Sequence, residues 1–298
     1  MFKKIILSII IMATTICSTI SASPIKSTLN KYHFDDITIL VPSCDKYSPL
    51  WEPFFTLLFK NWPSLLTHNN NVPIVLIGNN KTYKSQRITN VSIPNEISWS
   101  DNVLEAIKHI KTKYTIIILE DYLFNAPVQE DNLHKYYNFM RKHNAAFMQL
   151  ANVSGNQSMV TISGTHPDGL QQFSKHSKYR TALQIGLWNT ASLKWLLRTR
   201  ESAWRFEIPG SIRSEGMPQP FLAATQHNIF SHLNAAHYGV INNRSLAFIK
   251  THGMEFQPGA LLLEDSFKAK YKLWKANSKC FIYKYIYEPT IKFARKIL

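Results

Sequence analysis

Three short apolar runs rich in β-branched residues limit what this chain can fold into. They are ITILV at residues 37–41, VPIVLIG at residues 72–78 and YTIIIL at residues 114–119. Unbroken apolar runs of this length predict strands buried on both faces, which is typical of parallel sheets covered by helices. Because parallel strands need crossover connections, we expect the segments between the runs to contain helices.

Helical patterns do occur between and after these runs. WEPFFTLLFKNW at residues 51–62 has helical apolar spacing, and so does the segment after Ser100 or Asp101, either of which suits a helix N-cap. A further helix is predicted at residues 131–143 and a strand at residues 145–153. The first half thus predicts strand–helix–strand–helix–strand, with right-handed crossovers and a parallel sheet.

The second half of the chain is less regular. A short strand and then a helix are expected within residues 181–207, and residues 209–226 are expected to be mostly loop. No linker divides the chain, so we predict one α/β domain at residues 36–265. The predicted fold class is therefore a mixed, mostly parallel sheet flanked by helices, with an irregular second half.

The N-terminus carries the clearest single signal. Two lysines precede an apolar stretch, and small residues then lead into Pro24. This layout predicts a secretory signal peptide at residues 1–22 and a polar connector at residues 23–35. Because Ile20 stands where cleavage prefers a small residue, an uncleaved anchor is the alternative. Either way we expect the rest of the chain outside the cytosol, whether secreted, periplasmic or lumenal.

The charge of the chain indicates an anionic partner, since the formal net charge is +15. No nucleic-acid-binding module accompanies it, so a phosphorylated substrate or an acidic lipid is favoured over nucleic acid. Residues 266–298 form a basic, aromatic C-terminal segment, with nine Lys or Arg residues against one Glu from Lys268 onward. We expect this segment either to contact an acidic membrane surface or to pack on the domain as a basic helix.

Polar side chains follow each of the three buried runs. Asp45 comes after the first, Asn79 after the second, and Glu120 and Asp121 after the third. Ligands of open α/β sheets bind beyond the carboxyl ends of the strands, so we expect these side chains at one site. The alternative is that Asp45 forms a turn and Asp121 is solvated.

The order of several blocks resembles a bacterial family of glycosyltransferases with the GT-A fold, a Rossmann-type mixed sheet. The blocks are ITILVPSCDKY, WEPFFTLLFKNWP, VPIVLIGNN, WSDNVLEAIKHIKTKYTIIILEDYLF, LQIGLWNTASLKWLL and ESAWRFEIPGSIRS. The resemblance implies transfer of a sugar from a nucleotide-sugar donor to a hydroxyl of a glycan or lipid-linked acceptor. Such reactions usually belong to the synthesis of surface polysaccharide.

The resemblance also implies a metal site. In GT-A enzymes the strand end that matches Glu120, Asp121 and Tyr122 carries a D-x-D motif, whose divalent cation (Mn²⁺ or Mg²⁺) bridges the donor phosphates. Tyr122 stands where the second Asp of that motif is expected, so basic residues are the alternative means of neutralising the diphosphate. By resemblance, the candidate metal ligands are Asp121, Glu120 and His252.

The other roles follow from the same resemblance. An inverting transfer needs a general base, and Glu207 is the candidate, with Asp121 as the second catalytic residue. Glu201 and Glu215 compete with Glu207 for this role, and a purely structural Glu207 is the alternative. The candidate donor contacts are Asp45, Ser43, Asn79, Glu120, Arg213 and Lys250. The candidate acceptor contacts are Trp204 and Trp188, because an indole can stack on a sugar face.

Two other functions stay open at this point. Nucleotide sugars are normally absent outside a bacterial cytosol, so a secreted glycan-binding protein on the same fold, without catalysis, is the main alternative. A glycoside hydrolase is the third hypothesis, in which Glu120 or Asp121 would form a carboxylate pair with Glu207.

Overall fold

The computed structural model describes residues 34–67, 72–151, 157–226 and 228–282. The predicted signal peptide and nearly all of the predicted connector lie outside the described residues, as do residues 283–298 of the C-terminal segment. Among the helices that are described, none has the length and apolarity needed to cross a bilayer.

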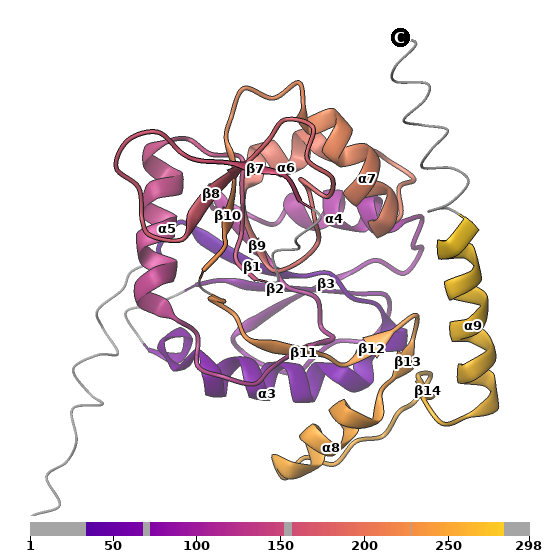
Figure 1. Ribbon diagram of the computed structural model, residues 1–298. Coiled ribbons are helices and arrows are strands. Elements are labelled where there is room, and N and C mark those ends of the chain that lie inside the picture. Colours follow the sequence, from indigo (N-terminus) through magenta and orange to yellow (C-terminus); the bar gives the residue numbers. More distant parts are fainter. Residues whose placement is uncertain (1–33, 68–71, 152–156, 227, 283–298) are drawn as a thin grey trace, which may run out of the picture.

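A nine-stranded sheet runs through the molecule in the order β3-β2-β1-β4-β9-β6-β10-β8-β7 (Figure 1). Its strands are β1 (Ile37–Val41), β2 (Ile74–Gly78), β3 (Ile88–Ser92), β4 (Tyr114–Ile117), β6 (Phe147–Gln149), β7 (Met159–Val160), β8 (Leu170–Phe173), β9 (Gly186–Asn189) and β10 (Phe221–Ala224). The first four strands pair in parallel, and β9 and β8 run against the others. The predicted class, a mixed and mostly parallel sheet flanked by helices, is confirmed.

Helices cover both faces of this sheet. They are α3 (Trp51–Asn61), α4 (Trp99–Ile107), α5 (Glu130–Lys142), α6 (Thr190–Leu196) and α7 (Ala203–Ser214). Ile39 and Val41 of β1 pack in one apolar cluster with α3 and α5, whereas Leu40 packs in a second cluster with α4, α6 and α7. Both faces of β1 are therefore buried, which explains why its sequence is apolar throughout instead of alternating.

Several predicted boundaries need correction. The N-cap of α4 is Ser98, whose Oγ accepts a hydrogen bond from the Asp101 N–H at 3.3 Å, and neither Ser100 nor Asp101 takes that position. The strand predicted at residues 145–153 is the shorter β6. The prediction of mostly loop at residues 209–226 is wrong, because α7 continues through Pro209 to Ser214 and β10 follows.

The remaining elements lie outside the nine-stranded sheet and the five helices that cover it. Two 3-10 turns, η1 (Asp45–Leu50) and η2 (Pro63–Leu66), flank α3. The other elements are β5 (Tyr122–Phe124), β11 (His232–Asn234), β12 (Ala236–His237), β13 (Val240–Ile241), α8 (Asn243–Thr251), β14 (Leu262–Leu263) and α9 (Phe267–Ile282). β5 pairs antiparallel with β11, so a segment from the second half of the chain is placed beside the end of β4.

Candidate functional site

The candidate site begins at the turn that joins β4 to β5. Glu120 and Asp121 form this turn, at the edge of the sheet where the parallel strands β1, β2 and β4 end. The backbone carbonyl of Asp121 accepts a hydrogen bond from the Ala235 N–H at 2.6 Å, which ties the turn to the segment after β11. The acids therefore stand where the fold class places ligands, as predicted.

Burial disfavours the ionised form of both carboxyl groups in this turn. Burial raises the pKa of Glu120, and the nearby charge of Asp121 raises it further. Burial also raises the pKa of Asp121. Within the described part of the chain, Asp121 Oδ1 is buried and has no hydrogen-bond partner. A buried oxygen without a partner loses its hydration and gains nothing in return, so it suits a ligand, a cation or a proton.

Glu207 approaches the acid turn from α7. Its Oε1 accepts a hydrogen bond from the Leu183 N–H at 2.7 Å, and the Tyr122 hydroxyl donates to the Leu183 carbonyl at 3.4 Å. Burial raises the pKa of Glu207, and the Leu183 N–H opposes this in part. The pKa of Tyr122 is raised by burial and then by the charges of Asp121, Glu207 and Glu120. Carboxylates from the two halves of the chain therefore both act on Tyr122.

Asp45 and Asn79 lie side by side, but their side chains hydrogen-bond each other's backbone N–H groups. Asp45 Oδ1 accepts hydrogen bonds from the N–H groups of Asn79, Asn80 and Lys81 at 2.9, 3.1 and 3.0 Å, and Asn79 Oδ1 accepts from the Asp45 N–H at 2.9 Å. Burial alone would raise the pKa of Asp45, but these backbone donors outweigh it and lower the pKa. This geometry is that of a carboxylate holding two loops together.

Ser43 connects the end of β1 to the acid turn. The Trp51 Nε1–H donates to Ser43 Oγ at 2.8 Å, and Ser43 in turn hydrogen-bonds the Glu120 carboxylate, which partly offsets the raised pKa of Glu120. Ser43 is thus a contact of the acid turn and stands beside the predicted donor site.

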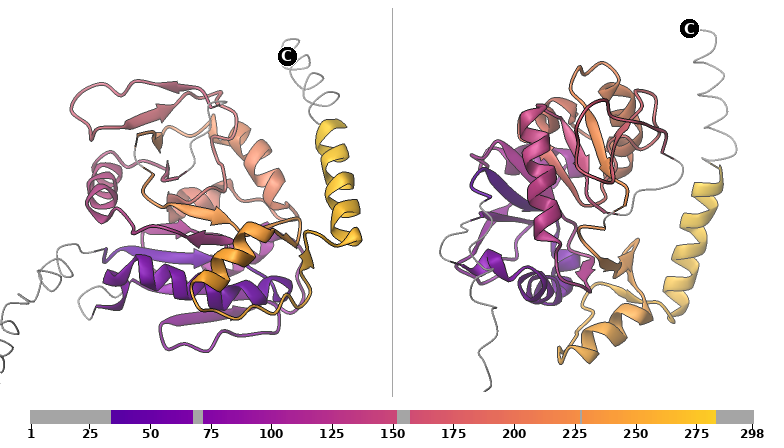
Figure 2. Two further views of the ribbon diagram at one scale, coloured as in Figure 1. Left: turned by 60° about the horizontal axis from the view of Figure 1, so that its bottom comes forward. Right: turned by 60° about the vertical axis from the view of Figure 1, so that its left-hand side comes forward.

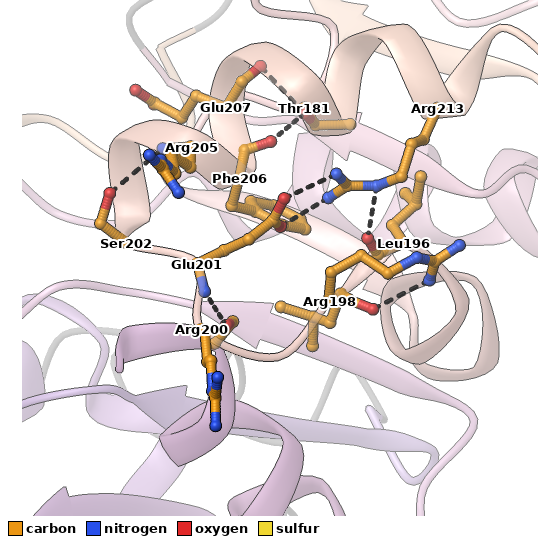
Figure 3. A network of polar contacts seen from close by, with 12 residues as sticks. Thr181, Leu196, Arg198, Arg200, Glu201, Ser202, Arg205, Phe206, Glu207 and Arg213 are labelled. Carbon is orange, nitrogen blue, oxygen red and sulfur yellow. Dashed lines mark hydrogen bonds and ion pairs between the residues drawn. The ribbon is translucent and has the colours of Figure 1, made fainter. Parts of the chain in front are cut away.

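Arg213 lies in an ion pair on α7 (Figure 3). Its Nη1 and Nη2 each lie 2.7 Å from an oxygen of Glu201, and its Nε–H donates to the Leu196 carbonyl at 2.9 Å. Both side chains are largely buried. The guanidinium predicted to bind the donor is therefore committed to a neighbouring carboxylate, and Glu201 is removed as a competitor of Glu207.

Trp188 does not lie at a surface. Its side chain is fully buried, and its ring lies 4.1 Å from that of Phe147 and 5.8 Å from that of Phe206, measured between centroids. The prediction that Trp188 contacts an acceptor is not met in this conformation, because a buried indole offers no face to a sugar. Trp204 is 49% exposed, and its ring plane lies within 10° of that of Tyr238.

Lys250 and His252 lie at the C-terminal end of α8. His252 Nδ1 is 2.9 Å from the Phe248 carbonyl oxygen, so the ring binds its own helix. Nowhere in the described residues do three His, Cys, Asp or Glu side chains form a group that could hold a metal ion. His252 therefore does not join Glu120 and Asp121 in such a group.

Sequence reasoning missed several residues at this site. The ring of His232 on β11 stacks on that of Tyr122 at 4.3 Å. The pKa of Tyr47 is raised by burial and then by the charges of Glu120 and Asp121. No local signal marks His232, because its position depends on the pairing of β11 with β5.

A polar cavity adjoins the His232 side of the site. Its volume is about 670 Å³, within the range of small-molecule sites. The side chains that give it its polar character are Gln184, Asn234, Asn242, Arg244, Ser245 and Glu264. Ser245 Oγ is buried and has no hydrogen-bond partner among the described groups. The cavity thus suits a ligand rich in hydroxyl groups.

No protein-family model matches the chain, and no curated protein matches it. Solved structures do. S. aureus TarS in complex with UDP-GlcNAc is 11% identical, with 68% of this chain and 61% of that chain covered and a TM-score of 0.40. The bifunctional IspDF from Campylobacter jejuni is 11% identical over 67% and 52%, with a TM-score of 0.40. The 2-C-methyl-D-erythritol 4-phosphate cytidylyltransferase from Thermus thermophilus is 7% identical over 73% and 98%, with a TM-score of 0.41.

This chain thus spans 61% of the TarS fragment and 52% of IspDF. These likenesses concern the arrangement of sheet and helices, and they assign no role to any residue of this chain.

Proposed function

We propose that the chain is a glycosyltransferase that moves a sugar from a nucleotide-sugar donor to a hydroxyl of a glycan or lipid-linked acceptor. The observation that carries the proposal is that Tyr122, next to Glu120 and Asp121 in the chain, and Glu207 of α7 both hydrogen-bond Leu183, beyond the carboxyl end of β4. Clustered carboxyl groups with raised pKa values in a cleft are typical of acid–base and phosphate-handling sites.

Glu207 is the proposed general base. Its raised pKa brings the carboxyl closer to neutral pH, where a base can take the proton of an attacking hydroxyl most effectively. The Leu183 N–H holds Oε1, which leaves Oε2 to face the acceptor hydroxyl. Trp204 lies three residues earlier on the same helix face and, with Tyr238, offers an aromatic surface for a sugar ring.

The acid turn is the proposed partner of the donor diphosphate. Glu120 and Asp121 supply two carboxylates, and Asp121 Oδ1 has no other partner among the described groups. Mg²⁺ or Mn²⁺ would fit here, because such cations complete their coordination with substrate phosphates and water when a protein gives only one or two carboxylates. A bound cation would neutralise charge on the departing diphosphate.

The polar cavity beside His232 is the proposed place of the acceptor. Its amide, hydroxyl, guanidinium and carboxylate groups can pair with sugar hydroxyls from several sides. It borders β11, which pairs with β5 next to the acid turn, and this proximity supports the assignment of the acceptor to the cavity.

The test begins with binding. The full chain is titrated calorimetrically with nucleoside diphosphates and nucleotide sugars, with and without Mn²⁺. We expect one nucleotide to bind, more tightly with the cation present and more weakly in Asp121→Asn. If a folded chain binds glycans but no nucleotide at all, a glycan-binding protein without catalysis replaces the proposal.

Turnover separates the remaining alternatives. Glu207→Gln is expected to keep nucleotide affinity and to lose transfer, because only proton removal is affected. Glu105→Gln is the matched control, since Glu105 is an exposed acid on α4 paired with Lys108. Release of free sugar from an oligosaccharide in the absence of any nucleotide would instead identify a glycoside hydrolase.

A further inference from the structure

The C-terminal helix α9 lies at the margin of the molecule (Figure 1) and stands beside the body in the turned views (Figure 2). Ala269 is fully buried and marks its inner side. Lys272 lies toward the same side: its Nζ is 3.6 Å from the point where a Cβ on Gly239 would stand, and the Nζ of Lys46 lies against the same point. One side of α9 therefore faces η1 and the β12–β13 hairpin.

The opposite side of α9 is aromatic and exposed. Phe267, Tyr271 and Trp274 are 84%, 55% and 65% exposed. Their spacing of four and then three residues puts them on one helix face, and Ala269 lies opposite that face. Large aromatic side chains are rarely left in water as a continuous stripe, so this face is expected to meet another surface.

Lysines border the aromatic stripe. Lys268, Lys270 and Lys275 are exposed, and α9 contains five lysines and no acidic residue. A helix with Trp, Tyr and Phe on one face and lysines at its edges has the composition of helices that lie in the plane of a bilayer interface. A second copy of α9 is a poor partner, because it would bring lysines against lysines.

We propose that α9 docks the protein on an anionic bilayer surface, with Phe267, Tyr271 and Trp274 at the acyl–headgroup boundary and the bordering lysines on lipid phosphates. This surface is separate from the acid turn, and the proposal does not depend on the function proposed above. Because Lys272 and Lys46 meet at Gly239, docking of α9 would also hold η1, one edge of the candidate site, near the bilayer.

The first test measures the depth of one side chain. The full chain is added to vesicles of phosphatidylcholine, with or without phosphatidylglycerol, whose acyl chains carry bromine as a fluorescence quencher. Trp274→Phe keeps an aromatic ring on α9 but removes the fluorophore, so we expect the quenched fraction of the emission to fall in this variant. Trp195→Phe is the control, since Trp195 is 51% exposed on α6, and in this variant the quenched fraction should not fall.

The second test measures the charge dependence of the Trp274-specific quenching. With phosphatidylglycerol present, Lys268→Gln/Lys275→Gln is expected to raise the vesicle concentration needed for half-maximal quenching about thirtyfold, because each lysine near an anionic surface contributes roughly fivefold. Lys135→Gln/Lys142→Gln, on α5, makes the same change in net charge and should have little effect.

Either of two results would overturn the proposal. One is bromine quenching that does not differ between the parent chain and Trp274→Phe, which would show that α9 stays out of the lipid. The other is concentration-dependent self-association that is lost in Trp274→Ser while vesicle quenching is absent, which would assign the aromatic face to a second copy of the chain. Neither the quenching of Trp274 nor self-association requires turnover, so failure of the glycosyltransferase proposal would not change either measurement.

Discussion

The ion pair of Arg213 with Glu201 gives the sharpest test of how the second half of the chain is held. Arg213→Met keeps the length of the side chain but removes its charge and its three donated hydrogen bonds. The side chains of the pair are only 19% and 13% exposed, so breaking the pair should cost nearly as much stability as breaking a buried pair. We expect the free energy of unfolding to fall by about 2–4 kcal/mol, because Glu201 is left as an unpaired, largely buried carboxylate.

Urea denaturation followed by circular dichroism measures this loss, and a double-mutant cycle isolates the pair. Arg213→Met, Glu201→Gln and the double variant should give a coupling energy of about 1.5–3 kcal/mol. Arg205→Met is the matched control: Arg205 is exposed on the same helix, and its loss should change stability by less than about 0.5 kcal/mol.

A different outcome would restore the role that the sequence suggested for Arg213. If Arg213→Met unfolds at the same urea concentration as the parent chain but binds a nucleotide diphosphate at least tenfold more weakly, the guanidinium is a donor ligand. The ion pair seen here would then belong to the free protein only, and the structural reasoning given for Arg213 would be refuted.

Three further outcomes follow from packing and burial. Gly186→Ala would place a Cβ against the ring of Phe147 in a full core, so urea denaturation should show a loss of about 1–3 kcal/mol; parental stability would contradict the clash. Because the pKa of Glu120 is raised above its usual 4.5, its folded form binds the proton more tightly, and stability is lost as pH rises from about 4.5 through the raised pKa. Glu120→Gln should therefore make the melting temperature depend less on pH in that range. An unchanged slope would show that Glu120 is not the titrating group. Trp188→Ala should cost about 3–5 kcal/mol in urea denaturation and Trp204→Ala under about 0.5 kcal/mol; equal effects would contradict their different burial.

The first half of the fold could be predicted because its strands and helices are specified by local patterns. The runs at β1, β2 and β4 are apolar because both faces of each strand are covered, and the apolar spacing of α3 reflects the one face that it buries. The acid turn could be located for the same reason, since it follows directly from the end of β4. Asp45 was found too, but the hydrogen bonds that give it a turn-like role come from a loop that is distant in sequence.

The second half could not be predicted, because long-range contacts override its local signals. Pro209 argues for a helix end, since it removes one backbone donor and crowds the preceding turn. Yet α7 continues, and Thr181 Oγ1 donates to the carbonyls of Phe206 and Glu207 at 3.1 and 3.2 Å, while Ser211 Oγ donates to the Glu207 carbonyl at 2.6 Å. The Thr181 hydrogen bonds tie the turn that contains the proline to the segment before β9, so a tertiary contact stabilises the helix although Pro209 donates no bond to the Arg205 carbonyl.

The same contacts determine where Glu207 lies, which is why the candidate base is the least predictable part of the site. Its backbone carbonyl is held by Thr181 and its carboxylate by the Leu183 N–H, two residues of the segment that leads into β9. β9 pairs with β4, whose carboxyl end carries Glu120 and Asp121. The position of α7 beside the acid turn thus depends on the pairing of β9 with β4, which no local pattern in the sequence specifies. A substitution that loosened the segment before β9 would separate Glu207 from the acids without touching any of the three.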